Sequence, residues 1–176
     1  MRGSDSQEIL NKVLNLLNNF VQLDVKGFDI SEEKRLYIDS ITVLFGAAFK
    51  DGIAVRCSLY LDEPVYILTL ISKDAVYEIS EGMNPGIDKD FEKVRYDENA
   101  LSFIVELVNL MTASVADRYA RRLNKRVLYS PPRVVRHIFS PNIIKGIDIR
   151  GRMANIIVYE FILSKPDSAI KMLLIY

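Results

Sequence analysis

Cysteine and histidine are almost absent from this chain of 176 residues, which has one of each, Cys57 and His137. A single cysteine excludes a disulfide within the chain and a zinc site made of cysteines, and it is typical of a reducing cytoplasm. Neither residue has partners that would complete a nucleophilic or metal-binding set, so we expect both to be structural. The sequence predicts a cytoplasmic protein with no bound metal and no cofactor of its own.

An excess of charge and a long apolar run are also missing. Lys and Arg number 23, as do Asp and Glu, so nothing points to a nucleic-acid partner. No apolar run approaches the ~20 residues that span a bilayer, so no membrane association is expected. The segment from Met1 to Ser4 lacks the apolar core of a signal peptide, and residues 1–6 are expected to be a disordered or cloning-derived leader. With 49% hydrophobic residues, the chain 1–176 is predicted to form a single domain.

The first half of the chain mixes helical and strand-like patterns. Residues 7–22 carry apolar side chains at helical spacing, which predicts an amphipathic helix. Residues 41–45 and 53–60 are typical of strands joined by a turn at Lys50-Asp51-Gly52. Asp62-Glu63-Pro64 resembles the start of a helix that would end near Ile71. The charged stretch 73–99 is predicted to be a long inserted loop with at most one helical turn.

The second half predicts one long helix followed by strands. The helix is expected to begin at an Asp97 cap and to end near Asn124. Strands are expected at 127–135, 147–163 and 170–176, the last two joined by a turn at 164–168. Helices interspersed with hairpins predict an α+β fold with a mostly antiparallel sheet packed against long helices.

The helix 97–124 carries an unusual polar stripe. At 100° per residue, Ser102, Glu106, Asn109 and Ala113 fall within roughly 60° of one another. The apolar stripe lies on another arc and consists of Leu101, Ile104, Val105, Val108, Met111 and Val115. A carboxylate and an amide beside a small residue indicate a surface that receives a partner. The alternative interpretation is an ordinary solvated helix face, where Glu and Asn are common.

The spacing of these residues resembles the active-site signature of the CheC/CheX/FliY phosphatases, which remove the phosphoryl group from the chemotaxis response regulator CheY. The signature is met by Ser102, Glu106, Asn109 and, after a further twenty-two residues, Pro132. Ala113 matches the small residue of the CheX branch. The resemblance implies a CheC/CheX-like fold and hydrolysis of an aspartyl phosphate on a CheY-type response regulator.

The resemblance also implies roles for single residues. Glu106 would pair with the active-site Lys of the response regulator, and Pro132 would shape the rim of the site. Asn109 is our candidate for orienting the attacking water, because a carboxamide accepts and donates hydrogen bonds and does not titrate. Ser102 would act as a cap or as a contact residue, and the small Ala113 would let the partner approach. Mg²⁺ is expected on the partner alone, and the CheX type implies a homodimer through sheet contacts.

Two departures from the family pattern limit the resemblance. CheC-type helices carry Gly just before the Asn, where this chain has Val108, which we place on the core face. The CheC type also repeats its Glu-Asn pair in a second helix. Here only Glu8 and Asn11 repeat the spacing, on an ordinary amphipathic face, so we expect one site per chain.

Other functions receive less support. A non-catalytic binding or scaffold domain of the chemotaxis and flagellar switch apparatus is the main alternative, because the flagellar switch proteins share this architecture. An unrelated enzyme would need a catalytic triad, a metal cluster or a phosphate loop, and none is present in the sequence. The basic residues at the end of the long helix are expected to complement the helix dipole and aid solubility rather than to bind nucleic acid: Arg118, Arg121, Arg122, Lys125 and Arg126.

Overall fold

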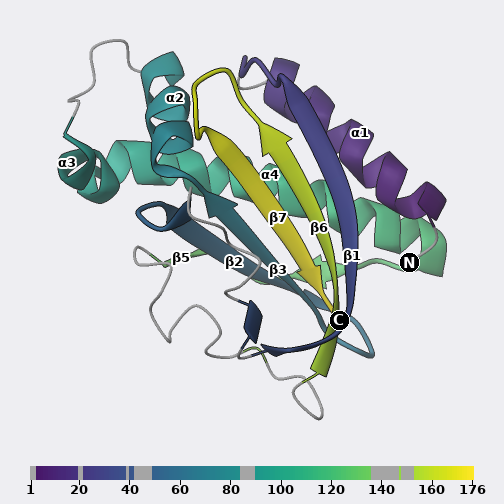
Figure 1. The fold of residues 1–176 in the computed structure, drawn as a ribbon. Helices are drawn as coiled ribbons and strands as arrows, with labels where there is room; N and C mark the ends of the chain where they lie inside the picture. Colours follow the sequence, from purple (N-terminus) through teal and green to yellow (C-terminus); the bar gives the residue numbers. More distant parts are fainter. Residues whose placement is uncertain are drawn as a thin grey trace.

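A computed structural model describes residues 3–19, 22–38, 40–41, 49–83, 90–135, 147 and 153–176 (Figure 1). Within these residues, seven strands form one sheet in which every pairing is antiparallel. The helices pack against this sheet, so the predicted α+β class with a mostly antiparallel sheet is confirmed.

The sheet has the strand order β1-β6-β7-β3-β2-β4, with β5 also paired to β2. Its central strands are almost entirely buried, whereas β1 forms one edge and the short β4 the other. The strands span β1 Gly27–Tyr37, β2 Ile53–Tyr60, β3 Val65–Ile71, β4 Leu128–Tyr129, β5 Arg133–Val135, β6 Met153–Ile162 and β7 Ala169–Ile175.

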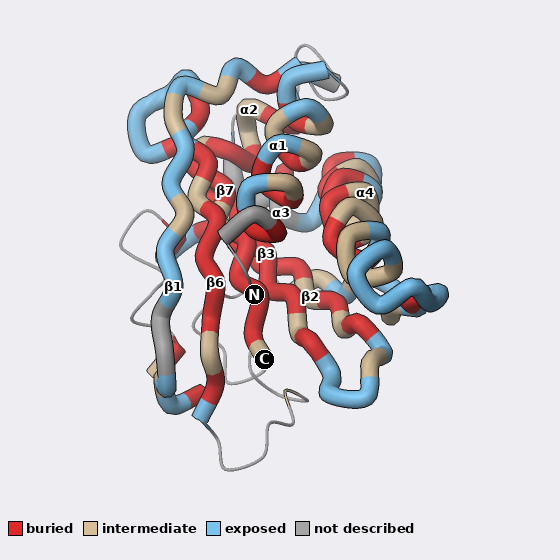
Figure 2. The backbone as a smooth tube through the Cα atoms, turned by 90° about the vertical axis from the view of Figure 1, so that its right-hand side faces the viewer, coloured by how far each residue is buried: buried red, intermediate tan, exposed pale blue. Residues whose placement is uncertain are grey.

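All four described helices contribute to the core on one face of the sheet: α1 Gly3–Asn19, α2 Lys73–Met83, α3 Phe91–Tyr96 and α4 Glu98–Leu123. The helix α4 crosses behind the strands, and α1 lies beside its C-terminal part (Figure 1). Figure 2 shows α1 and α4 together on one side of the buried strands. A second, smaller apolar cluster, which includes Phe49, Leu68 and Leu173, covers the opposite face of the sheet.

The predicted helix at 62–71 is wrong, because Val65–Ile71 is the strand β3. Apolar clusters cover both faces of this central strand, so its side chains are mostly apolar and do not alternate with polar ones. Pro64 precedes the strand, where its missing N–H costs no sheet hydrogen bond.

The predicted loop at 73–99 is also wrong, because the segment contains α2 and α3. The Ser72 hydroxyl accepts a hydrogen bond from the Ala75 N–H at 3.2 Å and caps α2. The apolar side chains of α2, including Val76 and Ile79, are buried while its charged residues face outward. Disorder at residues 1–6 is wrong from residue 3 onward, because α1 begins at Gly3 and Asp5 is buried.

The remaining strands were predicted only in part. The strand β1 was not predicted, and the predicted strand at 41–45 falls largely outside the described residues. The run 127–135 divides into β4 and β5 around Pro131 and Pro132, which cannot donate to a sheet ladder. The predicted strand 147–163 is β6, which begins at Met153.

Among the described residues, one helix, α4, is long and apolar enough by composition to span a membrane. Half of its apolar window is buried inside the fold, and Ile104, Val108 and Met111 are fully enclosed by the core. In this structure α4 is therefore a core helix.

Candidate functional site

The helix α4 has well-defined ends that agree with prediction. Asp97 is the N-cap, and its side chain accepts a hydrogen bond from the Ala100 N–H at 2.8 Å. Asn124 is the C-cap in the left-handed conformation, and its N–H donates to the Ala120 and Arg121 carbonyls. The twenty-six residues between these caps hold the candidate site.

The buried face of α4 is close to the predicted stripe. Val108 is fully buried, so its predicted place on the core face is confirmed. Val105 is only half-buried, whereas Leu107 and Thr112 are buried and were not predicted to be. The apolar stripe is therefore rotated slightly toward Leu107, which leaves the opposite polar stripe open.

That polar stripe reaches the surface. Ser102 and Glu106 are exposed, and Asn109 and Ala113 are half-buried. Within the described part of the chain, neither the Glu106 carboxylate nor the Asn109 amide forms a hydrogen bond or ion pair. Both groups can therefore contact a molecule that lies against this face without breaking a contact to another described residue.

The C-terminal part of α4 is different, because its charged side chains are paired. Arg118 pairs with Asp5 and, at 2.7 Å, with Glu8 of α1, and Arg121 pairs with Asp117 at 2.9 Å. The two Arg118 contacts fix α1 against α4, whereas the Arg121–Asp117 pair lies within α4. They also add a role that the sequence did not indicate for this basic run, which holds two helices together in addition to complementing the helix dipole.

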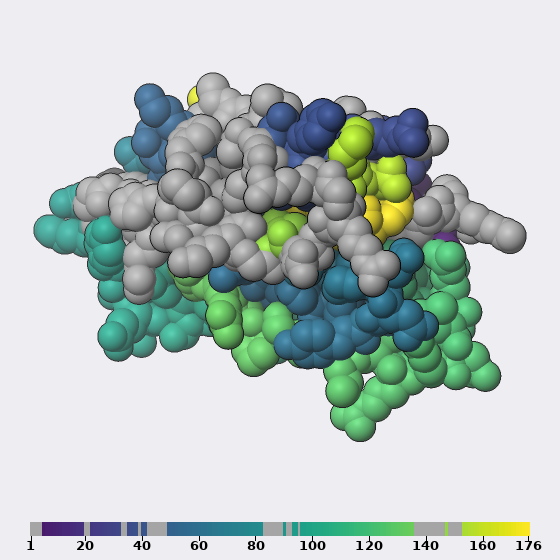
Figure 3. Space-filling model, turned by 90° about the horizontal axis from the view of Figure 1, so that it is seen from below, coloured from purple at the N-terminus to yellow at the C-terminus, as the bar shows by residue number. Residues whose placement is uncertain are grey.

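Lys125 makes a further connection, beyond the end of α4, to the β2–β3 turn. Its Nζ lies 3.3 Å from Oδ2 of Asp62. Seen from below, the turn and the C-terminal end of α4 lie side by side (Figure 3). The end of α4 therefore lies next to the β2–β3 turn, while the polar stripe of the helix stays open.

Glu8 and Asn11 repeat the Glu-x-x-Asn spacing on α1, but their surroundings differ. Glu8 pairs with Arg118 and Lys12, and Asn11 accepts a hydrogen bond from the Gln7 side chain at 3.2 Å. These groups are used within the fold, unlike Glu106 and Asn109.

Pro132, the remaining predicted site residue, is half-buried in the segment that joins β4 to β5. Both of these strands contact α4. The structure therefore brings Ser102, Glu106, Asn109 and Ala113 onto one helix face and places Pro132 in a segment beside that helix.

Cys57 lies on β2 in the core between the sheet and the helices. Burial raises the pKa of its thiol, and the nearby Thr112 side chain opposes this only in part. The thiol is therefore protonated at neutral pH, which fits a structural role. His137 lies outside the described residues, among which no group of three His, Cys, Asp or Glu side chains is arranged for a metal ion.

A polar pocket on the other face of the sheet was not foreseen. Alternate residues of β2 point away from α4, namely Arg56, Ser58 and Tyr60, and they line a cavity of about 200 Å³ together with Arg133. The sequence carried a signal for this pocket, because polar residues alternate with apolar ones from Val55 to Tyr60.

Comparison by sequence identifies no relative: no protein-family model matches the chain, and no curated protein matches it. Comparison by structure finds several matches. FliY from Thermotoga maritima superposes with a TM-score of 0.68 at 19% identity, covering 97% of this chain and 86% of that one.

Two further structures are similar over nearly the whole chain. A CheX-CheY complex with BeF3 and Mg²⁺ from Borrelia burgdorferi gives a TM-score of 0.65 at 12% identity, covering 99% of this chain and 98% of that one. The FliM middle domain from H. pylori gives a TM-score of 0.65 at 8% identity, covering 98% of this chain and 87% of that one. At these identities the likeness concerns the fold, and the chain has the fold of the CheC/CheX/FliY proteins.

Proposed function

We propose that this protein accelerates hydrolysis of the aspartyl phosphate on a CheY-type response regulator. The observation that carries the proposal is the open pair on α4, because Glu106 and Asn109 have no partner within the described chain although nearby charged residues do. The fold supports it, since one protein of this fold was solved in complex with CheY.

The chemistry of the two side chains fits this reaction. Phosphoryl transfer needs mainly positioning and electrostatic stabilisation, and the regulator would supply its own Mg²⁺, phosphorylated Asp and Lys. The Asn109 amide oxygen would accept a hydrogen bond from the attacking water while its NH₂ donates to the phosphoryl group. Glu106, one turn earlier on the helix, would orient the docked regulator through its Lys. Ser102, Ala113 and Pro132 would form the surrounding contact surface.

The alternative function is a binding domain without catalysis. The FliM middle domain has the same fold, so the fold by itself does not require hydrolysis. The open Glu106–Asn109 pair favours the catalytic function, because a domain that only binds has no need of a water-orienting amide.

The decisive experiment follows the decay of a phosphorylated CheY-type regulator with and without this protein. We expect the intact protein to accelerate the decay, and we expect Asn109→Ala to lower the acceleration by about 10²- to 10³-fold, as loss of one positioning group does. If the Asn109→Ala variant accelerated the decay as well as the intact protein does, the amide would not have the role assigned to it.

Asn11→Ala is the matched control, because Asn11 has the same spacing after a glutamate but lies on α1 and is bonded to Gln7. It should leave the decay rate unchanged. Binding of the phosphorylated regulator with no change in its lifetime would assign the protein to the non-catalytic class.

The assembly and location are part of the same proposal. We place the protein in the cytoplasm, as a single domain with one site per chain and no cofactor of its own, and as a homodimer through sheet contacts. The free edge of β1 supports such a contact, because within the described residues this strand pairs only with β6.

A further inference from the structure

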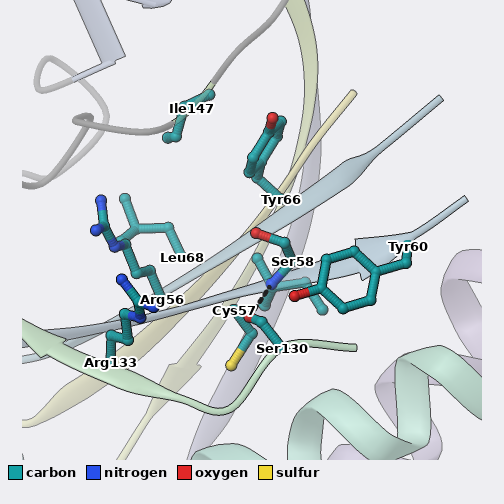
Figure 4. Close-up of a pocket in the computed structure, with 10 residues that line it drawn as sticks. Arg56, Cys57, Ser58, Tyr60, Tyr66, Leu68, Ser130, Arg133 and Ile147 are labelled. Atoms are coloured by element: carbon teal, nitrogen blue, oxygen red, sulfur yellow. Dashed lines mark hydrogen bonds between the residues drawn. The ribbon is translucent and has the colours of Figure 1, made fainter. Parts of the chain in front are cut away.

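The polar pocket on the sheet face opposite α4 is built mainly from β2, β3 and the segment that follows β4. Its floor includes Leu68 and its wall Ile147, while polar side chains cover most of the remaining surface (Figure 4). The pocket and the α4 stripe lie on opposite faces of the sheet, because Arg56, Ser58 and Tyr60 alternate with Val55, Cys57 and Leu59 of the helix-side core. Whatever binds here does not occupy the site proposed above.

Two arginines stand next to each other in this pocket. Arg56 on β2 and Arg133 on β5 are direct partners in the antiparallel register, and their guanidinium groups extend to the same side (Figure 4). Like charges directly opposite each other on a sheet are unfavourable. Arg56 already has an interaction within the chain, but Arg133 has no ion pair or hydrogen bond in the described part of it. The unmet charge is therefore that of Arg133.

Hydroxyl groups line the other side of the cavity. The Ser130 hydroxyl accepts a hydrogen bond from the Ser58 N–H at 3.0 Å, which leaves its own proton to donate. The Tyr60 hydroxyl points toward these serines (Figure 4). Guanidinium donors on one side and hydroxyl donors on the other suit an anion with oxygens in several directions, such as tetrahedral phosphate, better than a planar carboxylate.

The size of the pocket limits the ligand. At about 200 Å³ it is smaller than the ~300–1,000 Å³ pockets that enclose drug-sized molecules. We propose that this pocket binds a phosphate group, either as the free ion or as the end of a small phosphate monoester. Arg133 and Arg56 bind the charge, and the Ser130 and Tyr60 hydroxyls donate to the remaining oxygens.

The test is a titration of the intact protein, at constant ionic strength with chloride as the background anion, followed by backbone amide NMR. Inorganic phosphate and glycerol phosphate are the two probes. We expect saturable chemical-shift changes in β2 and β5. We expect Arg133→Gln to raise the dissociation constant for phosphate about tenfold, as loss of a charge-assisted hydrogen bond does. Arg133 is exposed, so this variant keeps its fold.

Arg126→Gln is the matched control, since it removes the same charge from an exposed residue outside the pocket. It should bind phosphate as the intact protein does, and Tyr60→Phe should bind more weakly. Binding of inorganic phosphate alone would identify the free ion as the ligand, and binding of both probes would identify a phosphate end group. The absence of saturable chemical-shift changes would overturn the proposal. An equal loss of phosphate affinity in Arg126→Gln and Arg133→Gln would overturn it as well.

Discussion

At the scale of single residues, Gly52 lies against the backbone of a neighbouring strand. This glycine precedes β2, and its N–H donates to the Phe49 carbonyl at 3.1 Å. A Cβ added at this position would lie 2.1 Å from the carbonyl oxygen of Ile71. That oxygen belongs to the backbone at the end of the central strand β3, so it cannot move aside without displacing the sheet.

Gly52→Ala should therefore destabilise the protein by about 3 kcal/mol, the upper range for overpacking a well-packed site. Denaturant unfolding gives this free energy directly. Gly27→Ala is the matched control, because its added Cβ would meet only the Ile162 side chain at 3.7 Å, an ordinary contact. Similar unfolding free energies for the two variants would contradict the steric explanation.

At the scale of elements, the contact between α1 and α4 depends on charge. Asp117 of α4 accepts a hydrogen bond from Lys12 of α1, which is the main reason that the pKa of its carboxyl group lies below the ordinary value; Arg121 contributes less. A carboxylate with a lowered pKa stabilises the folded state above the unfolded pKa, and this stabilisation is lost as pH falls through the folded value.

Asp117→Asn should accordingly lower the melting temperature at pH 7, and the difference from the intact protein should shrink toward zero as pH falls below about 4. Salt should shrink it as well, because both side chains of the pair are partly exposed to solvent. Asp62→Asn removes a carboxylate that is 95% exposed and should change the melting temperature little. A difference for Asp117→Asn that persists in acid would show that the ion pair is not its cause.

The same scale shows what the sequence could predict. The helix α4 was predicted to within a residue because Asp97 and Asn124 are strong caps around a long apolar period, and local chemistry alone determines its ends. The strand β3 was not, because a short apolar run enclosed on both faces has no alternation, and Asp62-Glu63-Pro64 imitates a helix start. Its strand conformation comes from pairing with β2, the preceding strand, and with β7, which is far away in the sequence.

The candidate site residues likewise differ in whether the sequence alone could predict their position. The exposure of Ser102 and Glu106 follows from helical geometry, so the sequence was sufficient to predict it. The pocket residues Arg56 and Arg133 come from strands more than seventy positions apart, and only the β2–β5 pairing brings them together. Glu8 of α1 forms an ion pair with Arg118 of α4, and this contact is likewise set by tertiary structure.

At the scale of the whole molecule, the two sheet edges differ. The edge strand β4 has two residues and is followed by Pro131 and Pro132, so it offers little backbone for pairing. The opposite edge, β1, spans eleven residues and exposes Phe28 and Tyr37. Among the described strands, β1 therefore offers the longer edge along which a second copy of the chain could extend the sheet.

We therefore expect light scattering at micromolar concentration to give twice the 20.1 kDa chain mass. Phe28→Lys should shift the equilibrium toward the monomer, because it places a charge at the exposed edge. A monomer mass for the unaltered protein would remove the homodimer from the proposal, and it would leave the α4 site, which is complete within one chain, unaffected.

The open stripe of α4 also has a consequence for the entropy of association. Its backbone is already ordered by the core beneath it and by the ion pairs at its far end, so docking restricts only side-chain rotamers, at about 0.5–1.5 kcal/mol for each. A partner would therefore meet a surface that needs no folding step, and complex formation would resemble the meeting of two rigid bodies. Because no ordering of the backbone opposes association, a larger part of the contact energy would be expressed as affinity for the partner.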